Sequence, residues 1–253
     1  MYINMIQSVA RAVYILEYIS KHHMLGLSEI SRGVGLNKST THGLVATLEI
    51  MGCIRQDQTT GKYALGLKLF ELGQAVLSHM DIRAIAMPHL VHLARKYEET
   101  VHLAVLSHDE VVYIDKVDSP RSIRHISQVG GRNPAYCTGV GKVLLAGLSD
   151  QKLQKLLKKI KFRQYTPNTI SDMNLLKKHL RKVRKDGYAL DQEEIEVGLS
   201  CVAAPIKNYR DNVIAAISLA GPTSRIANDS LHQLIADITE IARLISIQLG
   251  YKD

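Results

Sequence analysis

The sequence has no tryptophan, two phenylalanines and only three cysteines in 253 residues. Cys53, Cys137 and Cys201 lie far apart and include no C-x-x-C pair, which disfavours a disulfide framework and a cysteine-rich zinc module. No apolar run approaches the roughly 18 residues that span a bilayer, and the first residues do not have the pattern of a secretion signal. We therefore expect a soluble, cytoplasmic protein that contacts no membrane.

The length predicts two domains, at roughly 100–200 residues per domain, and 46% hydrophobic residues are typical of a globular chain. The net charge of +8 is concentrated in residues 151–187, which contain twelve Lys and Arg against two Asp and Glu. Leucines recur there at helical spacing, a pattern typical of two amphipathic helices with solvated faces. The alternative is a surface that contacts phosphates or an anionic ligand.

The first fifty residues have the pattern of three helices. The expected helices cover residues 8–21, 28–34 and 38–51. Ser8, Ser28 and Asn37 are predicted N-caps, and Gly35 is predicted to make the turn between the second and third helices. Two short helices joined by such a turn form a helix-turn-helix, whose second helix presents its N-terminal residues to the major groove.

The segment CIRQDQTTGKYAL follows the third helix and alternates as two short strands around a Thr-Gly turn. A hairpin in this place is the wing of a winged helix, which brings Arg55 and Lys62 close to phosphates. The residues predicted to contact DNA are Ser28, Lys38, Ser39, Thr40, Thr41, His42, Arg55 and Lys62. The alternative is a small helical bundle whose hairpin never meets DNA.

These segments resemble the IclR-type bacterial transcription regulators. The resemblance runs through QSVARAVYILEYIS, LSEISRGVGLNKSTTHGLVATLE and GKYALGLKLFELG, and it continues through the second half of the chain. It implies a winged helix-turn-helix with a linker helix over residues 1–79 and a GAF-like effector-binding and oligomerisation domain over residues 80–253. Gly43 departs from the many members with arginine at this place, which removes a possible charge-assisted contact.

The second half of the chain has strands at both ends of a helical region. The expected strands cover 100–108, 110–118, 121–129, 198–206 and 212–220, and the expected helices cover 66–80, 82–97, parts of 142–187, and 230–249. The turn at residues 210–212 predicts a hairpin, and Gly250 predicts the end of the last helix. This order predicts an α/β (α+β) domain with helices packed on an antiparallel sheet, in agreement with the GAF-like fold.

The segment PAYCTGVGKVLLA contains Gly-x-Gly-Lys but not a phosphate-binding loop. Tyr136 and Val143 occupy the places where a Walker A motif needs glycine and Ser or Thr. What remains is a helix N-terminus with exposed backbone N–H groups at Gly139 and Val140, which favours a carboxylate. The alternative is a tight turn that only docks a helix on the sheet.

An acidic cluster at residues 191–196 precedes Cys201, and by composition such a cluster is typical of a solvated loop. The resemblance implies instead that this stretch belongs to an effector pocket. The implied pocket residues are Ser122, His125, Thr138, Gly139, Val140, Asp191, Cys201, Ser218 and Ala220. Ala220 stands where some relatives have a second pocket serine, whereas Ser122, His125 and Asn133 fall near positions that are apolar in some relatives. A polar ligand such as a sugar acid would follow.

The sequence contains no H-E-x-x-H, G-x-S-x-G or G-x-G-x-x-G motif, and no known signature surrounds either Cys137 or Cys201. We therefore expect no catalysis, no metal and no cofactor. The expected partners are double-stranded operator DNA, a small carboxylate effector and further copies of the chain, since one winged helix reads too few base pairs. The resemblance implies a homodimer or homotetramer that represses transcription. The alternative is a ligand-binding or catalytic module whose winged helix contacts proteins.

Overall fold

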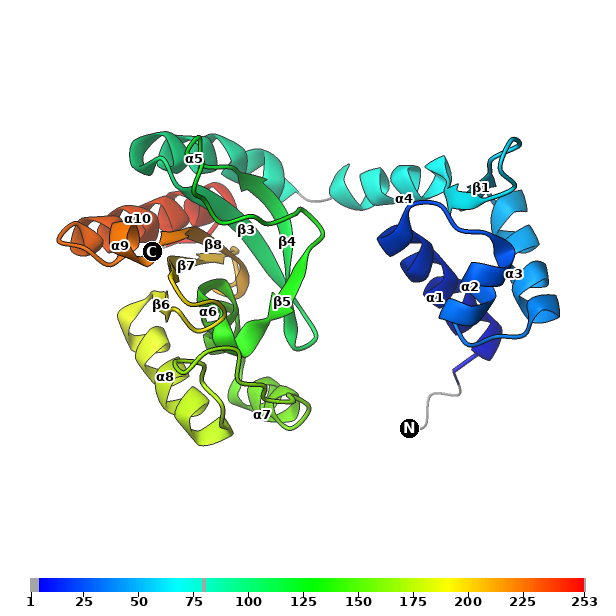
Figure 1. Cartoon of the computed structure of the whole chain (residues 1–253). Coiled ribbons are helices and arrows are strands. Elements are labelled where there is room, and N and C mark those ends of the chain that lie inside the picture. Colours follow the sequence, from blue (N-terminus) through cyan, green and yellow to red (C-terminus); the bar gives the residue numbers. More distant parts are fainter. Residues whose placement is uncertain (1–4, 79–80, 253) are drawn as a thin grey trace. The chain divides into compact units, whose positions relative to one another are not determined.

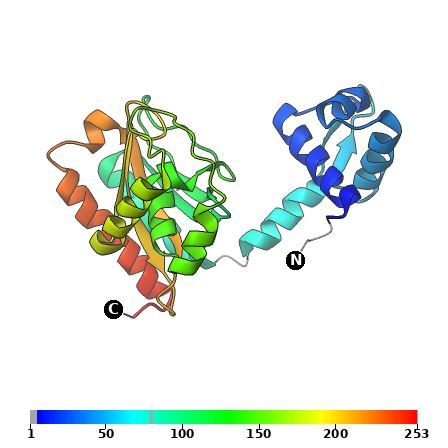
Figure 2. The same ribbon diagram turned by 90° about the horizontal axis from the view of Figure 1, so that it is seen from below.

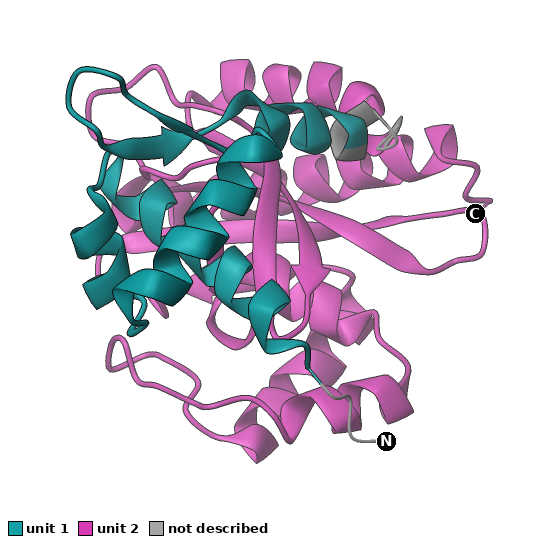
Figure 3. Cartoon of the chain, turned by 90° about the vertical axis from the view of Figure 1, so that its right-hand side faces the viewer, with its two compact units in different colours: residues 1–80 teal, residues 81–253 magenta. Residues whose placement is uncertain are grey.

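The computed structural model describes residues 5–78 and 81–252. Residues 1–80 and 81–253 form two compact units, coloured teal and magenta in Figure 3. The boundary predicted near residue 79 lies outside the described residues. None of the described helices is long and apolar enough to cross a membrane.

The first unit is a winged helix-turn-helix followed by a further helix (Figure 1). Its elements are α1 (Gln7–His22), α2 (Leu27–Gly33), α3 (Lys38–Ile50), β1 (Ile54–Gln56), β2 (Tyr63–Leu65) and α4 (Leu67–Ser78). The strands β1 and β2 pair antiparallel, as the alternation around the Thr-Gly turn predicts. A small core holds the helices and the hairpin together, and its fully or nearly fully buried members are Ile15, Ile19, Ile30, Val45, Leu48, Ile54 and Tyr63.

One of the three predicted helix caps is confirmed and two are wrong. Asn37 caps α3, because its side-chain oxygen accepts the Thr40 N–H at 2.8 Å. Ser8 lies inside α1, which begins one residue earlier without a side-chain cap. Ser28 lies inside α2, where the Glu29 carboxylate instead accepts the Gly26 N–H at 2.7 Å. The start of α2 is therefore stabilised by an acidic residue in its first turn. The negative charge of this residue also interacts favourably with the positive end of the helix dipole.

The second unit is built on a six-stranded antiparallel sheet in the order β5-β4-β3-β8-β7-β6. The strands are β3 (Thr100–Ser107), β4 (Glu110–Val117), β5 (Arg132–Pro134), β6 (Ala189–Gln192), β7 (Leu199–Lys207) and β8 (Val213–Pro222). The predicted antiparallel sheet and the hairpin of β7 and β8 are confirmed. A short 3-10 turn, η1 (Ala135–Cys137), leads from β5 into the first helix after it.

Helices cover both faces of this sheet (Figures 1 and 2). The helices are α5 (Asp81–Tyr97), α6 (Gly139–Ala146), α7 (Asp150–Leu157), α8 (Met173–Asp186), α9 (Thr223–Ile226) and α10 (Leu231–Gln248). α5 and α10 pack together on one face, and α6 packs on the other face with α8 against it. Gly250 has a φ of 87° after the last helix, as the sequence predicts for its end.

One predicted strand in this unit is wrong, and two of its strands, β5 and β6, were not predicted. The predicted strand over 121–129 is a loop, since side chains bind its carbonyls: Arg225 donates to Ile123 O at 2.8 Å and Lys116 donates to Ser127 O at 2.5 Å. β5, which pairs with β4, begins only at Arg132. The sequence analysis also missed β6, because two of its four residues are polar and it opens the acidic cluster.

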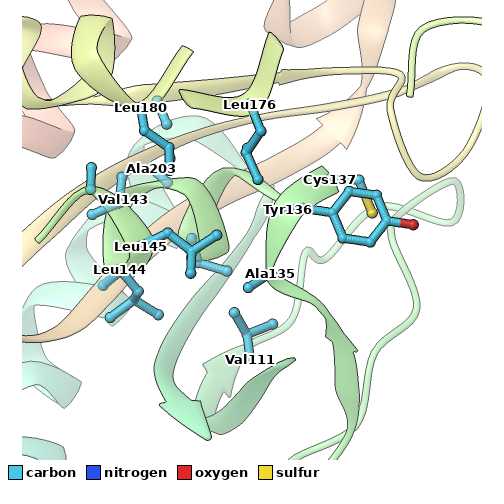
Figure 4. Close-up of a cluster of buried hydrophobic side chains, with 14 of the residues drawn as sticks. Val111, Ala135, Tyr136, Cys137, Val143, Leu144, Leu145, Leu176, Leu180 and Ala203 are labelled. Carbon is cyan, nitrogen blue, oxygen red and sulfur yellow. The ribbon is translucent and has the colours of Figure 1, made fainter. Parts of the chain in front are cut away.

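The helix α6 is buried along its whole length, and this position brings its first turn to the candidate site. Figure 4 shows Val143, Leu144 and Leu145 of α6 in a cluster that also includes Leu176 of α8 and Ala203 of β7. A methyl group at Gly141 would lie 2.2 Å from the carbonyl oxygen of Ala135. Only glycine therefore permits this approach between α6 and η1.

Candidate functional site

The N-terminal turn of α3 presents polar side chains on the surface of the first unit. Lys38, Ser39 and His42 are exposed and Thr40 is half-buried, while Val45 and Leu48 anchor the same helix in the core. Ser28 is exposed on α2. The helix thus holds hydrogen-bonding groups on a rigid element, as a major-groove reading helix requires.

Thr41 is an exception among the residues predicted to contact DNA. Its side chain is fully buried, and its hydroxyl donates to the carbonyl oxygen of Asn37 at 2.9 Å. It therefore supports the start of α3 from inside the unit and does not reach a DNA surface. Gly43, two residues later, is exposed, and a methyl group added there would meet no atom within 4 Å.

The hairpin of β1 and β2 carries the two predicted phosphate contacts. Arg55 lies on β1 and Lys62 follows the turn, and both are exposed. The turn between the strands is ordered by the Asp57 carboxylate, which accepts the Thr60 N–H and hydroxyl, both at 2.8 Å. These hydrogen bonds, led by that from the Thr60 hydroxyl, lower the pKa of Asp57.

A cavity of about 20 Å³ lies in the second unit between the first turn of α6 and the sheet. Its lining residues are His102, Tyr113, His125, Asn133, Thr138, Gly139, Val140, Asp191, Ile195, Leu199, Cys201, Ser218 and Ala220. They come from all six strands of the sheet, the loop before β5, the start of α6 and the loop after β6. A volume of this size holds about one water molecule.

Eight of the nine predicted effector residues line this cavity, and only Ser122 lies apart from it, exposed in its loop. The sequence analysis did not identify His102 or Tyr113 as lining residues. A signal existed for His102, because it is a polar residue in the middle of the otherwise apolar β3. Register places it opposite Ser218, which the resemblance did identify.

The wall opposite α6 carries neutral polar groups. His102 Nε2 lies 2.8 Å from the Ser127 hydroxyl, and the Asn133 amide donates to the Tyr113 hydroxyl at 3.2 Å. Burial lowers the pKa of His102 to about 3 and also lowers that of His125, so both imidazoles are uncharged at neutral pH. The wall can hydrogen-bond hydroxyl and carbonyl groups without adding charge.

The first turn of α6 closes the cavity from the other side. Thr138 caps the helix, its hydroxyl accepting the Gly141 N–H at 3.3 Å. The sequence predicts exposed backbone N–H groups at Gly139 and Val140, but both residues are buried. A methyl group at Gly139 would lie 2.6 Å from Cys201 Sγ. Burial raises the pKa of the Cys201 thiol, while a backbone hydrogen bond from Gly139 opposes this. The thiol is uncharged and unsuited to nucleophilic chemistry.

By composition the acidic cluster is typical of a solvated loop, but two of its four carboxylates are buried, and Asp191 lines the cavity as the resemblance implies. Asp191 and Glu194 are buried, and Asp191 Oδ1 accepts the Glu194 N–H at 2.8 Å. Glu194 forms an ion pair with Lys142, whose side chain is 2% exposed and also donates to the Leu190 carbonyl oxygen. Burial raises the pKa of Asp191 to about 7. Lys142, the lysine of the Gly-x-Gly-Lys segment, is therefore an internal counter-ion directly behind the cavity.

The cavity adjoins a surface cleft of about 330 Å³, with which it shares His125 and Leu199. Ile123, Ile126 and Val197 line this outer cleft and are largely exposed. Four residues of the loop over 121–129 line the outer cleft, and one of them, His125, also lines the cavity. A ligand larger than water therefore needs this loop to move before it can reach α6.

A larger cleft, of about 410 Å³, lies at the other end of α6. Its cations already have partners, since Arg184 donates to the carbonyl oxygens of Ala146 and Leu148 and Lys207 pairs with Asp211. The smaller cavity, with its neutral polar wall and helix N-terminus, is the better candidate ligand site. Within the described part of the chain, no three His, Cys, Asp or Glu side chains are placed to hold a metal ion.

Comparisons with known proteins match both units. The family description "Bacterial transcriptional regulator IclR C-terminal" matches residues 74–247, and "IclR helix-turn-helix domain" matches residues 8–58. The HTH-type transcriptional regulator KdgR of Escherichia coli is 37% identical over 248 residues, which cover 98% of this chain and 94% of that protein.

Two further relatives agree in sequence and in structure. The transcriptional repressor IclR of Escherichia coli is 35% identical over 97% of this chain and 90% of its own length. The crystal structure of an IclR homologue from Microbacterium hydrocarbonoxydans, complexed with 4-hydroxybenzoate, has a TM-score of 0.84 at 27% identity over 96% of this chain and 98% of that one. The chain therefore belongs to the IclR family, whose members are DNA-binding transcriptional regulators and not enzymes.

Proposed function

We propose that this regulator represses transcription from its operator in the cytoplasm and that a small polyhydroxy carboxylate, such as a sugar acid, controls its binding to DNA. The observation that carries the proposal is the cavity at the first turn of α6. One side offers a helix N-terminus, which favours a carboxylate, and the other offers the neutral polar groups of His102, Tyr113 and Asn133.

The polar wall distinguishes a hydroxylated ligand from an apolar one. A hydrophobic acid would offer no hydrogen-bond partner to His125 and Ser218, at a cost of about 1–3 kcal/mol for each buried group left unpaired. Hydroxyl groups would satisfy them. The 4-hydroxybenzoate complex of the Microbacterium homologue supports a carboxylate in this fold, and the name of the repressor IclR supports repression.

Control of DNA binding requires that the ligand prefer one conformation of the protein, and its effect is limited by that preference. The cavity as folded holds about one water, so a ligand must displace the loop over 121–129 and change its contacts with Thr100, Lys116 and Arg225. The two conformations of the protein therefore differ in this loop, which is closed without ligand and displaced when ligand is bound.

The proposal includes a homodimer or homotetramer. Val9 and Val13 of α1 and Leu67, Phe70 and Leu72 of α4 are 46–78% exposed, although all are apolar. A second copy would cover such side chains. Two reading heads would then lie on a palindromic operator, with the exposed start of α3 in the major groove and Arg55 and Lys62 of the wing at the phosphates.

The direct test is thermal unfolding of the full chain against a panel of small carboxylates that includes keto acids, aromatic acids, uronates and sugar acids. A ligand at 100 times its Kd stabilises the folded state by about 2.7 kcal/mol. We expect sugar acids to raise the unfolding temperature and to release the protein from its own promoter DNA.

The variant Ser218→Ala removes one hydroxyl from the cavity and should reduce that stabilisation. Ser122→Ala, at the predicted residue outside the cavity, is the matched control and should respond like wild type. A response only to aromatic acids, or an unchanged response of Ser218→Ala, would show that the proposed ligand class or site is wrong.

A further inference from the structure

The basic excess of the sequence lies on α7, α8 and the loop between them. The helices are amphipathic as predicted, with Leu153 and Leu157 of α7 and Leu176 and Leu180 of α8 buried. Their opposite faces carry exposed cations at helical spacing. Lys155 and Lys159 lie on or just after α7, and Lys178, Arg181, Lys182 and Lys185 form one stripe along α8. We call these six side chains the basic face.

Members of the basic face have no acidic partners in the described part of the chain. Between residues 151 and 187 only Arg184 forms an ion pair, with Asp150. One of the two acidic residues of this stretch, Asp172, is already used as the N-cap of α8. Several other cations of the unit are paired, as in Lys207 with Asp211 and Arg225 with Glu99. Like charges three or four residues apart on a helix destabilise it, so an external anion would relieve this repulsion.

The two helices meet at a cleft of about 240 Å³, which is lined by Asp150 and Gln154 of α7 and by Lys177, Arg181 and Arg184 of α8. Lys155 and Lys159 line a neighbouring cleft on the other side of α7, together with Asp109. The buried leucines hold both helices against the core around α6, so the charges are displayed from rigid elements. The cleft between the helices contains no buried, unpaired polar group that would select a small ligand. An extended polyanion fits this surface better than a small anion does.

We propose that the basic face binds the phosphate backbone of duplex DNA that flanks the segment read by α3. Five of its six residues are lysines, which contact phosphates as point charges and do not read bases. The first unit of the same chain already holds DNA, so the flanking duplex is present at a high effective concentration. The sensor unit thus adds sequence-independent affinity to the sequence-specific contacts of the reading head.

The test measures binding of the full chain to a 60-bp and a 15-bp duplex of random sequence by fluorescence anisotropy over a range of salt concentrations. The variant Lys178→Gln/Arg181→Gln/Lys182→Gln/Lys185→Gln removes four contacts. Each phosphate contact contributes about 0.9 to the slope of log affinity against log salt, so the slope on the 60-bp duplex should fall by up to about 3.6 per chain. The 15-bp duplex, which the reading head occupies, should show little change.

The matched control removes four exposed cations outside the basic face, in Arg95→Gln/Arg124→Gln/Arg210→Gln/Lys252→Gln. It has the same net charge as the test variant and should keep the wild-type slope on both duplexes. Circular dichroism checks that each variant is folded. Equal slopes for wild type and test variant on the 60-bp duplex would overturn the proposal. The basic face would then bind an acidic protein or remain exposed to solvent. An equal fall in the control would also overturn it, because net charge alone would then explain the effect.

Discussion

The reading helix and the effector cavity are built in opposite ways. Lys38, Ser39, Thr40 and His42 lie within five consecutive positions at the start of one helix, on the surface. The cavity collects its lining from segments between His102 and Ala220, and most of those side chains are buried. A surface site can be specified by a short motif, whereas a buried site depends on the packing of a whole unit.

This difference has an energetic consequence. Surface polar groups are hydrated until they bind a ligand, and they contribute little to the free energy of unfolding. Their replacement should therefore affect ligand or DNA binding and not stability. Buried polar groups such as Lys142, Asp191 and His102 are desolvated in the folded state, so their replacement should affect stability as well.

Lys142→Met should lower the free energy of unfolding by about 3–5 kcal/mol, because it leaves the buried Glu194 carboxylate without its counter-ion. Urea denaturation measures the loss. Lys185→Met, at an exposed lysine of α8, should change stability by only about 0.5 kcal/mol or less. The double variant Lys142→Met/Glu194→Leu should recover most of the loss. A double variant no more stable than Lys142→Met would show that the unpaired charge is not the cause.

Neighbouring threonines on α3 should separate DNA binding from stability. Thr40→Ala, at the half-buried position, should weaken operator binding by about 1–3 kcal/mol without changing the unfolding midpoint. Thr41→Val loses the buried hydrogen bond to Asn37 and should lower stability by about 1 kcal/mol. Electrophoretic mobility shifts on the natural promoter and urea denaturation measure the two effects. The contrast fails if both variants lose the same property.

Asp191 and His102 should give opposite dependences of stability on pH. The pKa of Asp191 is raised from 3.8 to about 7, so between pH 4 and 7 only the folded state keeps this proton, and stability falls as pH rises. The pKa of His102 is lowered from 6.5 to about 3, so over pH 3–6.5 only the unfolded state gains a proton, and stability falls as pH drops.

Denaturation from pH 4 to 7.5 therefore resolves the two groups. Asp191→Asn should make stability rise more steeply with pH than in wild type, and His102→Asn should make it rise less. Ser122→Ala, outside the cavity, is the control and should follow the wild-type curve. Parallel curves for all four proteins would show that neither group is desolvated as the structure indicates.

Gly43→Arg should have the smallest effect. The position is exposed with open space around it, so an arginine fits and stabilises α3 by about 1 kcal/mol. A phosphate contact from the new side chain would steepen the salt dependence of DNA binding by about 0.9. Gly43→Ala supplies the helix propensity without the charge and should leave the salt dependence unchanged. Identical salt slopes for both variants would place this position away from the DNA.

Local signals predicted what depends on local structure. Asn37 as a cap, the Thr-Gly turn of the wing and the hairpin turn at residues 210–212 all follow from residues within a few positions of one another. The segment over 121–129 has the composition of a strand but forms a loop, because Lys116 and Arg225 bind its carbonyl oxygens and Arg225 lies 102 residues beyond Ile123. The composition of the acidic cluster favours a solvated loop, whereas the resemblance implies a pocket; composition alone is insufficient because Lys142, the partner of Glu194, lies 52 residues before it.

Two domains, a winged helix-turn-helix and, through resemblance, most of the residues that line the cavity can be predicted from the sequence. Which polar groups are desolvated depends on tertiary packing. It buries Thr41, His102, Asp191, Glu194 and Lys142, leaves the lysines of α8 in solvent, and closes the cavity to the size of one water. Burial depends on which elements pack against a side chain, and helical or strand periodicity does not specify those partners.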